Sequence, residues 1–212
     1  MKMNTKSSLA PLVSAALWAV AAPAHAVDKV NIDWPCVQRK VENINVSQVW
    51  DGPSIDGLKG WWEDKELNAV IESVANRRVD LKEAEEAIKA FAGKLPAADK
   101  DPKLTLLFAG LFDKVGTQRR AVVNGLEKFL RSQRDRAKDI EDQGAAIAEL
   151  EAKAQADEKA AAELAAAQEK FEWATRIFQE RQQSIPVACE LPVIIDARLY
   201  DLARTIRTNM SK

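Results

Sequence analysis

The two cysteines are the side chains of this sequence with the widest choice of chemistry. Cys36 lies in the stretch WPCVQRK, and Cys189 lies in IPVACELP. A nucleophilic cysteine needs a neighbouring base or a helix N-terminus to lower the pKa of its thiol, and a metal-binding cysteine needs other ligands at close spacing. The sequence has no CxxC motif and no cluster of histidines. If the chain is exported, two lone cysteines favour the third hypothesis, a disulfide between Cys36 and Cys189.

The N-terminus has the features of a secretory signal peptide. Two lysines precede an uncharged apolar run, Leu9–Ala22, which is followed by APAHA, a small-residue cleavage site, before Val27. The run is shorter than the roughly 20 residues that a membrane span needs, although an uncleaved anchor is the alternative. We therefore predict a cleaved signal peptide over residues 1–26, a periplasmic location, and a mature chain without a membrane span.

Removal of the signal peptide would change the inventory of reactive groups. His25 is the only histidine, so the mature chain would have no imidazole. That excludes Ser-His-Asp and Cys-His catalysis and every His-ligated zinc or copper site. The mature chain would keep 29 basic and 32 acidic residues, a formal charge of −3, which argues against a nucleic-acid partner. We expect no catalytic residue, no metal site and no cofactor.

Prolines flank both cysteines. Pro35 precedes Cys36, and Pro186 and Pro192 stand on either side of Cys189. Proline biases the chain toward extended backbone, so we expect two extended segments that the disulfide joins side by side.

A helical base is predicted on both sides of a longer central segment. Its N-terminal part is residues 27–116, and its C-terminal part, 184–212, ends in a helix. Helix starts are expected at Asp80 and at Asp101-Pro102, because aspartate is a common N-cap and proline suits the first helical position. The apolar residues with helical spacing are Leu67, Val70, Ile71 and Val74, then Leu81, Ala84, Ile88 and Phe91, then Leu104, Leu107, Phe108, Leu111, Phe112 and Val115, and finally Ile195, Leu199, Leu202 and Ile206.

The central segment, residues 117–183, contains no proline and is rich in strong helix formers. Apolar residues fill most positions of a heptad pattern, although Gln133 and several other polar residues interrupt it. One straight helix would carry Cys189 far from Cys36, whereas a hairpin that turns near residues 150–160 would bring them together. The expected neighbours in that hairpin are Leu126 with Phe178, Phe129 with Phe171 or Thr175, and Ile140 with Leu164. A straight helix would instead have to pair between chains and make the protein a homo-oligomer.

Three tryptophans close together in the sequence form the candidate binding site. Trp50 precedes the turn DGPSIDG, and Trp61 and Trp62 lie in GWWEDKE beside several acids. Exposed tryptophans would form a platform for a glycan, a peptide or a partner helix. The alternative is that they close the core of the base, since large aromatic side chains are usually buried.

These features predict an all-α protein: a small, disulfide-clamped helical base that carries a projecting antiparallel coiled-coil hairpin, the arm. The function expected from them is that of a non-enzymatic periplasmic scaffold, assembly or accessory protein, which binds other periplasmic or envelope proteins through its helices. A holdase ranks lower, because the arm is rich in alanine and has few large apolar residues. The alternative from another class is a cell-wall or glycan binder or enzyme that uses the Trp61–Trp62 region and nearby carboxylates.

Overall fold

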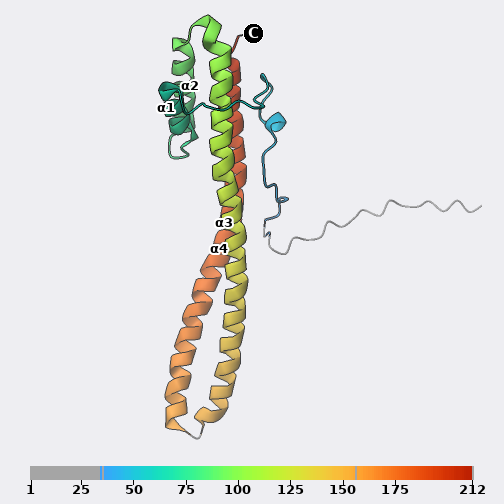
Figure 1. Cartoon of the computed structure of the whole chain (residues 1–212). Coiled ribbons are helices and arrows are strands. Elements are labelled where there is room, and N and C mark those ends of the chain that lie inside the picture. Colours follow the sequence, from blue (N-terminus) through green and yellow to red (C-terminus); the bar gives the residue numbers. More distant parts are fainter. Residues whose placement is uncertain (1–33, 35, 156, 212) are drawn as a thin grey trace, which may run out of the picture. The chain divides into compact units, whose positions relative to one another are not determined.

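The computed structural model describes residues 34, 36–155 and 157–211 of the chain. These residues form a short 3-10 helix, η1 (Val46–Gln48), and the α-helices α1 (Lys65–Ala75), α2 (Leu81–Lys94), α3 (Ala97–Ala154) and α4 (Glu158–Thr208). They contain no strand, and α3 and α4 pack against each other as a hairpin (Figure 1). The all-α class and the hairpin are therefore confirmed. The predicted signal peptide lies outside the described residues.

Both short helices begin at aspartate caps. The Asp64 carboxylate accepts hydrogen bonds from two backbone amides in the first turn of α1, each 3.1 Å long, and Asp80 accepts one of 2.9 Å in α2. These caps satisfy amides that have no partner within the helix. The predicted apolar face of α1 is confirmed, since Leu67, Ile71 and Val74 are fully buried.

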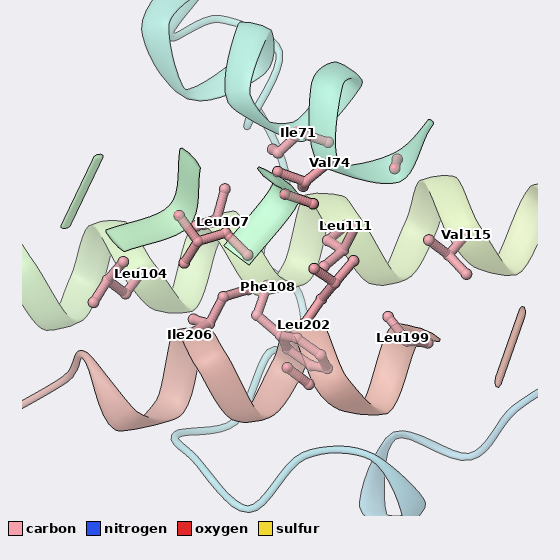
Figure 2. Packing of buried hydrophobic residues seen from close by; sticks show 14 of the residues in the cluster. Ile71, Val74, Leu104, Leu107, Phe108, Leu111, Val115, Leu199, Leu202 and Ile206 are labelled. Carbon is pink, nitrogen blue, oxygen red and sulfur yellow. The ribbon is translucent and has the colours of Figure 1, made fainter. Parts of the chain in front are cut away.

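The core of the base lies where α1 and α2 meet the beginning of α3 and the end of α4 (Figure 2). Phe108 of α3 is fully buried, and the Trp50 ring stacks on it with centroids 4.0 Å apart and planes 8° from parallel. The other large, fully buried side chains of α2, α3 and α4 are Ile88, Leu104, Leu107, Leu111, Ile195, Leu199, Leu202 and Ile206. Burial of each such side chain stabilises the fold by roughly 1.5–3 kcal/mol relative to its exposure.

The predicted start of α3 is wrong. The helix begins at Ala97, directly after Pro96, so Asp101 is not its N-cap and Pro102 lies inside it. Pro102 has no amide to donate to the carbonyl four residues earlier, which costs helix stability. The helix continues because the apolar side chains from Leu104 onward are buried on both α1 and α4.

The expectation of an extended backbone at Cys189 is also wrong. Pro186 and Pro192 both lie inside α4, which runs unbroken from Glu158 to Thr208. Proline fixes φ near the helical value, so a long helix with packing partners can retain it despite the missing amide. The disulfide itself is confirmed: Cys36 and Cys189 are bonded, with their Cα atoms 5.4 Å apart.

The register of the hairpin differs from the predicted one by one heptad. Leu126 packs against Ile185 and Ala188 instead of Phe178, and the Gln133 side chain reaches the carbonyl of Phe178 at 3.5 Å. The turn lies between the end of α3 at Ala154 and the cap of α4 at Asp157, about four residues beyond the midpoint that the predicted pairs imply. A later turn moves every residue of α3 opposite a later residue of α4.

The predicted boundaries between base and arm, at 116/117 and 183/184, fall inside continuous helices, because α3 and α4 each belong to both parts. Within the part of the chain that the structure describes, none of the helices combines the length and the apolar character needed to cross a membrane.

Candidate functional site

The three predicted tryptophans do not form one exposed platform. Trp50 and Trp61 are buried, with 8% and 7% of their surface exposed, whereas Trp62 is 53% exposed. Trp61 and Trp62 meet edge to face, with centroids 5.4 Å apart. Burial of two of the three rings supports the core interpretation for Trp50 and Trp61 and leaves Trp62 as the candidate for binding.

Trp61 is held against α3 by a close approach at Gly110. A Cβ atom at Gly110 would lie 2.8 Å from the indole of Trp61 and 2.4 Å from Cδ1 of Ile71. The ammonium group of Lys114 lies 5.7 Å from the centre of the Trp61 ring and forms an ion pair with Glu72 of α1. These contacts fix Trp61 as a wall of the cavity beside it.

A cavity of about 580 Å³ lies between the loop that precedes α1 and one face of α3. We call it the Trp62 cavity. Ala109, Phe112, Gly116 and Arg120 line it from α3 at helical spacing. The other lining residues are Asn43, Ile44, Ile55, Leu58, Lys59, Trp61, Trp62 and Asp113. The volume of the cavity is within the range of small-molecule sites. Asp113 is the only carboxylate among these lining residues, so they contain no pair of acids of the kind that hydrolyses glycosides.

The disulfide belongs to a second anchored region, on the seam between α3 and α4. The Gln38 side chain donates to the carbonyl of Cys189, and Arg119 donates to Asp196 of α4 at 2.7 Å and to the carbonyl of Val41 at 2.6 Å. Arg119 is buried, so these bonds replace its hydration. The disulfide and the arginine thus fasten the N-terminal segment across both long helices.

Sequence reasoning missed Arg119. Its only signal was a charged residue four positions after Val115 on an otherwise apolar face of α3. Its partners lie far away in the sequence, so periodicity gives no indication of them.

An apolar groove of about 580 Å³ lies beside this region, again between α3 and α4. We call it the arm groove. Val187 is 67% exposed, and Ile194, two turns further along α4, is exposed as well. The groove is lined by Val122, Gly125, Leu126, Phe129, Ser184, Val187, Ala188 and Leu191. It has no charged side chain in its lining, which makes it an exposed apolar surface of the kind that often marks an interaction site.

The arm groove continues the surface on which α1 and α2 pack. On α3, α1 contacts Gly110 and Lys114, and Gly125 of the groove follows 11 residues after Lys114, on the same helix face. On α4, Arg198 donates to the carbonyl of Val74 in α1 at 3.2 Å. Ile194, Leu191 and Val187 lie 4, 7 and 11 residues before Arg198, which places them on its face of α4. The face of the hairpin that α1 and α2 cover together, α1 on α3 and α2 on α4, is therefore left uncovered further along the arm.

The described residues contain no group of three or more His, Cys, Asp or Glu side chains placed to hold a metal ion. Comparison of the chain with protein-family models, curated proteins and solved structures finds no match. The Trp62 cavity and the arm groove are therefore the two surfaces that indicate a function.

Proposed function

We propose that this protein is a non-enzymatic accessory or scaffold protein of the bacterial periplasm, and that its arm groove binds an amphipathic helix of another periplasmic or envelope protein. The observation that carries the proposal is the continuity of the groove with the surface of the hairpin on which α1 and α2 pack. A surface that accepts a helix at one end has the width and apolar character to accept a second helix further along.

The contacts of α1 indicate what the partner helix would present. α1 buries Leu67, Ile71 and Val74, at spacing i, i+4 and i+7, in the core that it forms with α2 and α3. The partner helix would carry apolar residues at the same spacing. By helical register, Lys128 flanks the groove on α3 and Glu190 flanks it on α4, and both are exposed. A partner helix with acids on the edge beside α3 and bases on the edge beside α4 would match these charges.

The disulfide supports the periplasmic location, because disulfides persist in oxidising compartments such as the periplasm. The length of α3 supports a scaffold role. Its 58 residues span about 87 Å at roughly 1.5 Å per residue, so the hairpin extends well beyond the arm groove, which lies close to the base. The lack of any histidine beyond residue 25 supports a non-enzymatic role, since the commonest general base near neutral pH is missing.

A labelled peptide tests the proposal without knowledge of the natural partner. The probe is an amphipathic helix of about 18 residues, with leucines at i, i+4, i+7 and i+11 and the flanking charges described above, and its binding is measured by fluorescence anisotropy. We expect saturable binding that Val187→Glu weakens at least about tenfold, because the variant places a charge in the groove. Val193→Glu is the matched control: Val193 is 54% exposed but lies on another face of α4, so binding should not change.

A scrambled peptide of the same composition separates helix recognition from general adhesion to apolar surface. Equal binding of the two peptides, or equal binding to the Val187→Glu and Val193→Glu variants, would contradict the proposal. Thermal unfolding of both variants checks that neither substitution disturbs the hairpin.

A further inference from the structure

We infer that the Trp62 cavity binds a small amphiphilic anion, a ligand with an apolar chain or ring and one carboxylate group. This site is separate from the arm groove, and the inference does not depend on the function proposed for that groove.

The interior of the Trp62 cavity is suited to an apolar body. Ile44, Ile55 and Leu58 line it from the loop, and Trp61 and Phe112 add aromatic walls. Two small residues of α3, Ala109 and Gly116, leave space in the cavity. A Cβ atom at Gly116 would meet only the Arg120 side chain within 4 Å, at 3.6 Å. Transfer of an apolar group from water into such a site is favourable by about 25 cal/mol for each Å² buried.

The charges in the lining favour an anionic group on the ligand. Lys59 and Arg120 stand against a single acid, Asp113. Arg120 donates one hydrogen bond, of 2.9 Å, to the Thr117 hydroxyl, and its guanidinium group lies over Gly116 at the cavity wall. Most of its donors therefore remain to bind a carboxylate, which matches the guanidinium fork. The Arg120 guanidinium reaches back over Gly116, which is three residues or about 4.5 Å of helix rise from Asp113, so Lys59 and Arg120 together have to outweigh this one acid.

The small number of polar side chains in the lining argues against an oligosaccharide as the ligand. A sugar presents hydroxyl groups on most of its edges, and each needs a hydrogen-bond partner when buried. The cavity offers Asn43, Lys59, Asp113 and Arg120 as side-chain partners, whereas its other lining residues are apolar or glycine. Trp62 alone could stack on a sugar ring, and the glycan alternative is therefore one of the outcomes of the test.

Isothermal titration calorimetry with octanoate, octanol and octylammonium tests the inference, with each probe kept below its micelle-forming concentration. The three probes share a chain and differ in the charge of the head group. We expect octanoate to bind at one site, at least about tenfold more tightly than the other two. Arg120→Gln should reduce the preference for octanoate over octanol, since the variant removes the guanidinium group, keeps the chain contacts and leaves Lys59 as the remaining positive charge.

Filled-cavity variants locate the binding. Gly116→Leu places a side chain in the Trp62 cavity and should abolish octanoate binding. It should also fold, because leucine is a better helix former than glycine and the site is open. Gly125→Leu is the matched control, since it fills the arm groove instead and should leave octanoate binding unchanged.

Four outcomes would overturn the inference: no octanoate binding up to its solubility, equal binding of octanoate and octanol, tighter binding of octylammonium, or octanoate binding that survives in Gly116→Leu. Saturable binding of chitotriose that Gly116→Leu removes, without binding of octanoate, would favour the glycan alternative.

Discussion

Alanine substitution of two glycines in α3 should have opposite effects on stability. Gly110 and Gly125 both lie inside the helix, where alanine is better than glycine by about 1 kcal/mol. At Gly125, a Cβ atom would meet nothing within 4 Å, so Gly125→Ala should raise the free energy of unfolding by about that amount.

At Gly110, a steric cost opposes the gain in helix propensity. The new Cβ would lie 2.4 Å from Ile71 Cδ1 and 2.8 Å from the Trp61 ring, whereas carbon atoms in good contact are about 3.5–4.0 Å apart. Ile71 Cδ1 is the end of a flexible side chain, but the indole is rigid and is held by α1 and the loop before it. Overpacking of this kind typically costs about 1–3 kcal/mol and occasionally more, so after the gain of about 1 kcal/mol in helix propensity we expect a net loss of up to about 2 kcal/mol for Gly110→Ala.

Urea unfolding followed by circular dichroism measures both variants. The midpoint should fall for Gly110→Ala and rise for Gly125→Ala, with the dependence on urea unchanged in each. A Gly110→Ala protein as stable as Gly125→Ala would refute the reasoning, because it would mean that Trp61 and Ile71 do not pack on α3 at Gly110.

Three further predictions concern the disulfide, an ion pair and the hairpin seam. Replacement of Cys36 and Cys189 by serine should lower the free energy of unfolding by up to about 5 kcal/mol, since the bond spans 153 residues; an unchanged urea midpoint would contradict a structural role. The hydrogen bond from Lys103 lowers the pKa of Asp64 below its ordinary value of 3.8, with help from backbone amides at the helix cap. The ion pair should therefore stabilise the fold above pH 3.8, and this stabilisation should be lost as the pH falls through the lower pKa of the folded state. In urea titrations, the difference in stability between wild type and Asp64→Asn should shrink at acid pH. A difference that does not change with pH would exclude a contribution of the ion pair. Gln133 is buried, and its amide oxygen has no hydrogen-bond partner among the described residues. Gln133→Leu should therefore raise the free energy of unfolding by about 1–2 kcal/mol and raise the thermal midpoint with it. A lower midpoint would show that the amide is needed.

The features of the fold that the sequence predicted correctly depend either on local signals or on the exclusion of alternative arrangements of the chain. The buried face of α1 follows from the spacing of Leu67, Ile71 and Val74, and the predicted cap at Asp80 acts within a few residues of itself. The disulfide follows because two cysteines allow one intramolecular pair. The hairpin follows from the disulfide, since a straight helix would separate Cys36 from Cys189.

The features that could not be predicted depend on contacts between distant residues. Local rules favour extended backbone around Pro186 and Pro192, but packing against α3 keeps α4 helical through both. The register depends on where the turn falls, and the alanine-rich stretch around Ala154 and Asp157 contains no glycine or proline to mark it. A one-heptad error leaves the apolar pattern in phase, so periodicity alone cannot detect it.

The candidate site was predicted only in part. The tryptophan region was recognised, but its sequence does not distinguish the buried Trp61 from the exposed Trp62 beside it. That difference arises because Trp61 meets Gly110 of α3, which is 49 residues away in the sequence. The arm groove was missed for a related reason. Val187 and Leu191 belong to the apolar pattern of α4, and they stay uncovered because α1 and α2 pack further along the hairpin.

Site-specific photocrosslinking in cells is the most direct test of whether the arm groove binds a helix. Benzoylphenylalanine replaces Val187 or Ile194 on the groove side of α4 and Val193 or Tyr200 on other faces, where the native residues are also exposed. We expect that only Val187 and Ile194 give a crosslink to another envelope protein, and that mass spectrometry places it in a segment with apolar residues at i, i+4 and i+7. Equal crosslinking from all four positions, crosslinking to a second copy of this chain, or no crosslink from Val187 and Ile194 would contradict it.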